Sequence, residues 1–156
     1  MTKEINAITN DKQLREQLGS LDITQERLLA VLLIKSVIHL NSDAEINNIM
    51  LIAEDPDSSE AELLNAYKRI KAITTRTYTS CGNETDWKRQ AEHFVASAVM
   101  ACLTPVNQLR QTINLVWQTA MQTRMAKNCE MIERDSAEVD NEAFKQYRIV
   151  ELFLGK

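Results

Sequence analysis

Apolar residues recur along most of this chain at intervals of three and four, which is the spacing of one face of an α-helix. The segment that begins at Trp87 shows the spacing clearly, with apolar residues at 87, 91, 94, 98 and 102. The alternation of apolar and polar residues that is typical of β-strands is missing. The pattern therefore predicts an all-α protein, an irregular bundle of six to seven helices.

Polar residues that commonly begin helices stand in front of these segments. Three of them are interpreted as capping boxes, which have Gln or Glu three residues after the cap. The predicted N-caps are Asn10, Asp22, Ser42, Ser59 and Thr104, and the capping-box partners of the middle three are Gln25, Glu45 and Glu62.

Two of the expected helices differ from the rest. Residues 28–34 are all apolar, so a helix from Leu28 to Leu40 is expected to be buried on every side. From Pro105 the helical pattern continues to about Arg134. The sequence therefore predicts one long helix over about 105–134, roughly 45 Å in length.

Composition limits the architecture and the compartment. The 156 residues include only three Gly and two Pro, and no repeat or linker divides them, so residues 1–156 are expected to form a single helical domain. The cysteines, Cys81, Cys102 and Cys129, are odd in number and have no paired spacing. They indicate free thiols in a reducing compartment, and we expect a cytoplasmic protein with no membrane segment.

Residue types that carry chemistry are sparse. The two histidines, His39 and His93, have no Glu-x-x-His partner, and His93 is expected on a solvated helix face. The glycines lie too far apart to form a phosphate-binding loop. We therefore expect no catalytic residues, no metal and no cofactor.

Charge is almost absent from one stretch. Between Val106 and Thr123 the only charged residue is Arg110, and Asn, Gln and Thr occupy the side opposite the apolar stripe. Amides can donate and accept hydrogen bonds when water is excluded, so this composition suits a contact surface. Two interpretations remain open and can overlap: the stretch is a spine covered by other helices, or it is a surface between chains. The predicted partner-binding residues are Gln111, Asn114, Gln118, Gln122, Trp117, Met121 and Met125.

These observations predict a non-catalytic cytoplasmic interaction protein, acting as an adaptor, regulatory subunit or inhibitor. Its partner is expected to be a protein, with a homodimer as one possibility. The alternative is a helical nucleic-acid-binding subunit that uses a basic cluster around the 79–85 loop, although a net charge of −4 argues against strong phosphate binding. The cluster consists of Lys68, Arg69, Lys71, Arg76, Lys88 and Arg89.

Overall fold

The computed structural model describes residues 7–80, 86–109, 114–135 and 141–155. Seven α-helices, two short 3-10 helices and no strand occur in these residues, so the predicted all-α class is confirmed. The helices are α1 (Asp11–Leu18), α2 (Ile23–Lys35), α3 (Ala44–Glu54), α4 (Glu60–Ser80), α5 (Trp87–Leu103), α6 (Leu115–Arg134) and α7 (Glu142–Leu154), with 3-10 helices η1 (Ile38–Leu40) and η2 (Val106–Gln108).

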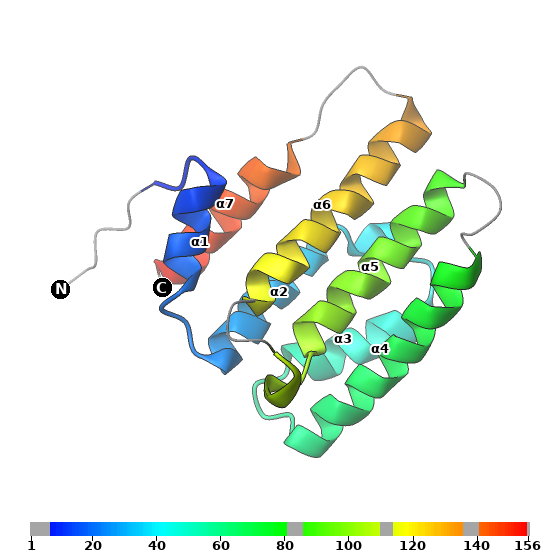
Figure 1. Ribbon diagram of the computed structural model, residues 1–156, viewed down its shortest axis with the longest axis horizontal. Helices are drawn as coiled ribbons and strands as arrows, with labels where there is room; N and C mark the ends of the chain where they lie inside the picture. The colour runs from blue at the N-terminus through cyan, green and yellow to red at the C-terminus, as the bar shows by residue number, and fades with distance from the viewer. Residues whose placement is uncertain (1–6, 81–85, 110–113, 136–140, 156) are drawn as a thin grey trace.

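Helices α5 and α6 run antiparallel along the middle of the molecule and pack together more extensively than any other pair in the described part of the chain (Figure 1). Helix α4 lies beside α5, and α2 lies behind α5 and α6. Helices α1 and α7 lie together on the outer side of α6, close to the two ends of the chain. Helix α6 is therefore flanked on several sides by other helices.

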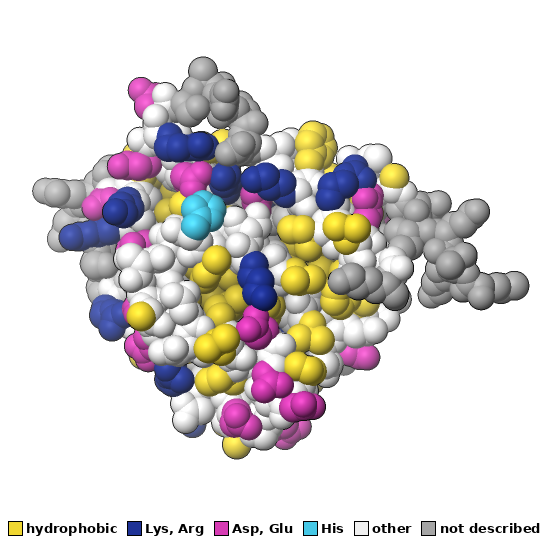
Figure 2. All heavy atoms as spheres, turned by 180° about the vertical axis from the view of Figure 1, so that it is seen from behind, with side chains coloured by type: hydrophobic (Ala, Val, Ile, Leu, Met, Phe, Trp, Pro, Cys, Tyr) yellow, Lys and Arg dark blue, Asp and Glu magenta, His cyan; other side chains and the backbone are white. Residues whose placement is uncertain are grey.

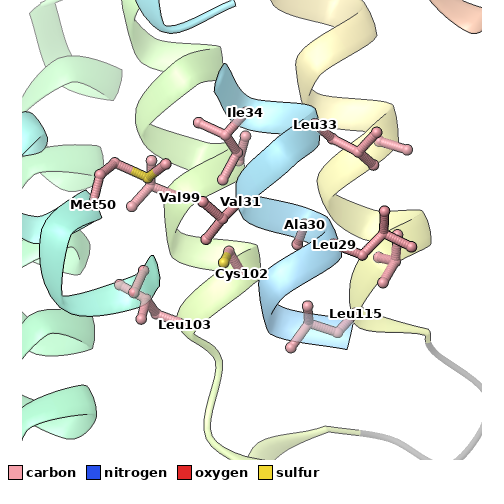
Figure 3. Packing of buried hydrophobic residues seen from close by; sticks show 14 of the residues in the cluster. Leu29, Ala30, Val31, Leu33, Ile34, Met50, Val99, Cys102, Leu103 and Leu115 are labelled. Atoms are coloured by element: carbon pink, nitrogen blue, oxygen red, sulfur yellow. The ribbon is translucent and has the colours of Figure 1, made fainter. Parts of the chain in front are cut away.

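The hydrophobic core is built around α2. Its side chains Leu29, Leu33 and Ile34 are buried and meet residues of α3, α5 and α6 (Figure 3). The expected burial on every side is only partly correct, because Leu32 is 38% exposed. The helix also ends at Lys35 rather than at residue 40, since the Ser36 N–H bonds back to Leu33 and the chain then turns into η1.

Most predicted helix starts are found. Asn10 accepts a hydrogen bond from the backbone N–H of Gln13, and reciprocal capping boxes form at Asp22 and Ser59. The prediction for Ser42 is wrong by one residue. Asp43 caps α3 instead, and the Ser42 hydroxyl donates to Glu92 on α5.

The predicted helix over 105–134 is wrong in its first part. Residues after Pro105 form the 3-10 helix η2, and α6 begins only at Leu115. The reason is local: the Asn114 side chain accepts hydrogen bonds from the backbone N–H groups of Val116 and Trp117. In a longer helix, carbonyls one turn earlier would take those hydrogen bonds, so the Asn114 cap sets a new helix start.

The face opposite that of Figure 1 carries a mixed surface (Figure 2). Groups of hydrophobic side chains are separated there by Lys, Arg, Asp and Glu side chains of both signs. A surface with charges of both signs lacks the single-sign field that attracts a polyanion over a distance.

Candidate functional site

Helix α6 carries most of the predicted partner-binding residues. Asn114 is not part of a helix face, because it is the N-cap of α6 and its side-chain amide also donates to Glu26 Oε1 at 3.0 Å. Burial raises the pKa of Glu26, while this hydrogen bond acts in the opposite direction. The amide of Asn114 therefore has partners within the chain. Gln111 lies outside the described residues.

Gln118 and Gln122 lie one turn apart on α6 and are half-buried. They line a shallow groove of about 340 Å³ between α6 and α5. No side chain in its lining is charged, and neither glutamine amide hydrogen-bonds to another described residue. The α5 residues of the groove are Ser97, Met100 and Ala101, and Thr104 lines it just after the helix ends.

The uncharged surface continues along α6 beyond the two glutamines. Met125 is 44% exposed and Ile132 is 50% exposed, and Asn128 is exposed between them. At 3.6 residues per turn these residues fall on the same side of the helix as Met121 and Gln118. We define the α6 stripe as Gln118, Met121, Gln122, Met125, Asn128 and Ile132.

Trp117 lies at the edge of this stripe toward α1. The guanidinium groups of Arg15 and Arg124 stand over its ring, 4.9 Å and 5.6 Å from the centroid. Trp117 and Met121 are both half-buried and pack against the core. Within this chain Trp117 therefore already has partners, and of the predicted hydrophobic contact residues Met125 is the most open.

Two threonines of the charge-poor stretch lie on the opposite side of α6 from the one expected. Thr119 and Thr123 are fully buried, and Gln146 of α7 donates to Thr123 Oγ1 at 2.7 Å. Gln146 also donates to the Ala120 carbonyl and accepts from Arg124 Nε. Part of the stretch is thus a buried polar seam within the chain, and Gln118, Met121 and Gln122 belong to the α6 stripe. The interpretation of the stretch as a surface between chains stays a prediction.

His93 is not the solvated surface residue that the sequence suggested. It lies half-buried between α4 and α5, where Nδ1 is 2.7 Å from the Thr77 hydroxyl and the ring contacts Tyr78 and Phe94. Burial lowers the pKa of His93. The prediction for His93 was wrong because it considered only the helical spacing around that residue. In the structure α4 covers that face of α5.

The six residues of the basic cluster do not share one surface. Three arginines pair with carboxylates: Arg69 with Glu45, Arg76 with Asp43, and Arg89 with Asp86. Lys68, Lys71 and Lys88 are exposed and form no ion pair with a described residue. On α4 the two lysines are turned away from the two arginines by the helical period, so the cluster is divided.

In the described ranges, no three His, Cys, Asp or Glu side chains are grouped closely enough to hold a metal ion. Within those ranges, too, every helix is too short or too polar to span a bilayer. No protein family model, curated protein or solved structure matches the chain.

Several residues of the candidate surface were absent from the sequence prediction. Asn128 and Ile132 continue the three-and-four spacing after Met125, so the helical period alone identifies them. The α5 residues of the groove had no such signal, because only the packing of two helices brings Ser97 and Met100 beside Gln118. The candidate site is therefore a joint surface of α5 and α6.

Proposed function

We propose that this protein is a non-catalytic cytoplasmic interaction protein, an adaptor, regulatory subunit or inhibitor, and that the α6 stripe is its partner-binding surface. One observation carries the proposal. Gln118 and Gln122 are half-buried in an uncharged groove, yet neither amide has a hydrogen-bond partner among the described residues. Amides in such a position gain most when a partner excludes water and supplies the missing hydrogen bonds.

The composition of the stripe supports a protein partner. The centres of protein interfaces are depleted of charged residues and enriched in methionine and aromatic residues. The stripe has no charge, and Met121 and Met125 provide an adaptable apolar surface. Helix α6 has 20 residues, so it is roughly 30 Å long. A helix of this length can pack along a helix of a partner protein.

A second copy of the chain fits this surface best. In a twofold symmetric contact the same surface patch of both copies meets, so a stripe with charges of one sign would place like charges together. Glutamine and asparagine amides both donate and accept, so they complement themselves. Met125 and Ile132 likewise find apolar partners in a second copy.

Sedimentation velocity over a micromolar concentration series tests the proposal. We expect the wild-type chain to sediment as a monomer and dimer in equilibrium. The Gln118→Glu, Gln122→Glu double variant places charges in the seam and is expected to remain monomeric. An Asn47→Asp, Asn48→Asp variant adds two charges on the exposed face of α3 and is expected to behave as wild type. A wild-type chain that stays monomeric throughout contradicts the proposal.

A further inference from the structure

A second cleft lies beside the groove, at the end of the bundle where α2, α4, η2 and the start of α6 meet. Its volume is about 550 Å³, which is within the usual range for small-molecule sites. Three of the exposed large hydrophobic residues surround it: Ile23 at 36%, Leu64 at 41% and Val106 at 63% exposure. Leu63, Leu103 and Leu115 complete its apolar wall.

The cleft also contains one buried cation. Arg27 of α2 lines it and is only 8% exposed. Its Nε donates to the Ala53 carbonyl at 3.3 Å, which satisfies an open carbonyl in the last turn of α3. No other hydrogen bond and no ion pair joins its side chain to a described residue. The contact with α3 therefore uses only Nε of Arg27. The two terminal nitrogens of the guanidinium have no acceptor among the described residues.

Those terminal nitrogens are not sealed in the core. Among the described residues, Glu142 Oε2 is the only fully buried side-chain nitrogen or oxygen without a hydrogen-bond partner. The two terminal nitrogens of Arg27 have no acceptor among the described residues and are not in that class, so they are not fully buried. Because Arg27 lines the cleft, we take the cleft as their route to solvent. A buried guanidinium without a counter-ion is unfavourable, and an anion that enters the cleft removes this penalty.

From this geometry we infer that the cleft binds a small amphiphile, a monocarboxylate with an apolar body, with the carboxylate on Arg27 and the body against Leu63, Leu64 and Val106. A guanidinium matches a carboxylate through two parallel hydrogen bonds. Glu60 also lines the cleft and adds negative charge, which disfavours dianions such as phosphate. The inference concerns a different site from the α6 stripe and does not depend on it.

Titration of the full chain with decanoate, followed by amide chemical shifts, tests this site. Acetate supplies the carboxylate alone, and 1-decanol supplies the chain without the charge. We expect saturable shifts at the cleft residues with decanoate, and at least about tenfold weaker binding of acetate and decanol. Equal affinity for decanoate and decanol would overturn the inference, as would the absence of saturable shifts at the cleft.

Two test variants and one control variant show whether decanoate binds in the cleft. Arg27→Gln is expected to weaken decanoate binding about tenfold or more and to leave decanol binding unchanged. Arg148→Gln removes an exposed arginine of α7 outside the cleft and is expected to bind as wild type. Because Arg27→Gln also disturbs the contact with Ala53, Leu64→Asp is the second variant: it changes an exposed residue and places a repelling carboxylate on the cleft wall. Unchanged decanoate binding in Leu64→Asp and in a folded Arg27→Gln contradicts the inference.

Discussion

Arg124 of α6 donates two hydrogen bonds to the carboxylate of Asp11 in α1, at 2.8 Å and 3.0 Å. The Tyr147 hydroxyl of α7 donates to the same carboxylate. Asp11 therefore joins α1 to α6 and α7, two helices more than 90 residues later in the sequence, and it holds α1 against α6.

Substitution Asp11→Asn tests how much this contact stabilises the fold. The side chain of Asp11 is 45% exposed, so we expect a loss of only about 1 kcal/mol in the free energy of unfolding. The hydrogen bonds from Arg124 lower the pKa of Asp11 below its ordinary value of 3.8. Its stabilisation is therefore complete above that value and is lost as pH falls through the lower, folded pKa. The free energies of unfolding of the wild type and Asp11→Asn, measured in urea, should converge at low pH. A difference between them that stays constant at all pH values would contradict this role of Asp11.

The hydrogen bonds of Gln146 explain why α6 has few charges on its buried side. Gln146→Leu removes one hydrogen bond each from the Ala120 carbonyl, Thr123 Oγ1 and Arg124 Nε. We expect a loss of about 2 kcal/mol in the free energy of unfolding. Thr119→Val is the matched control, since the Thr119 hydroxyl bonds only to the Leu115 carbonyl of its own helix. Thermal unfolding should show a clearly larger fall in Tm for Gln146→Leu, and similar losses would exclude a special role for the network.

We expect His93 to make the free energy of unfolding depend on pH near neutrality. Burial lowers the pKa of His93 from its ordinary value of 6.5, so the folded state disfavours its protonation. The corresponding stabilisation is complete above 6.5 and is lost as pH falls toward the lower, folded pKa. We expect His93→Gln to reduce the difference in unfolding free energy between about pH 7.5 and about pH 5.5. An equal difference in both chains would show that other groups cause it.

Cys102 is expected to be an inert thiol. It is fully buried, its Sγ lies 3.6 Å from the Arg27 carbonyl, and burial raises its pKa to about 12. The reactive thiolate is therefore almost absent in the folded chain near neutral pH. Mass spectrometry after iodoacetamide treatment should find Cys102 modified only when the chain unfolds. Modification at the rate of a free peptide thiol would contradict this placement.

Local patterns in the sequence predicted the helices well where all the residues of a pattern belong to one helix and its cap. The capping boxes at Asp22 and Ser59 need only residues three apart, and both are present in the structure. Asn114 favours a helix cap over a helix interior, but the start of α6 was missed because the helical pattern continues through this residue. The contact of Asn114 with Glu26 of α2 is not visible in the sequence.

The candidate site, too, was predicted only as far as the residues of one helix show it. The absence of charge from α6 was visible in the sequence, but it has two separate physical causes. At Thr123 a charged side chain would be buried, because Gln146 covers this position. Gln118 and Gln122 are uncharged residues of an open groove beside α5. Only the packing of α5 and α7 against α6 separates these causes. Arg27 was missed for a similar reason, since its burial depends on α3 and α4.

The most direct test of the central claim is to observe the side-chain amides of Gln118 and Gln122 by NMR during dilution of the wild-type chain. If the α6 stripe is the partner-binding surface and pairs with a second copy, both amide signals shift or broaden with concentration, and those of Asn47 and Asn48 on α3 do not. If the chain dimerises while the two glutamine signals stay unchanged, the contact lies elsewhere and the account is contradicted.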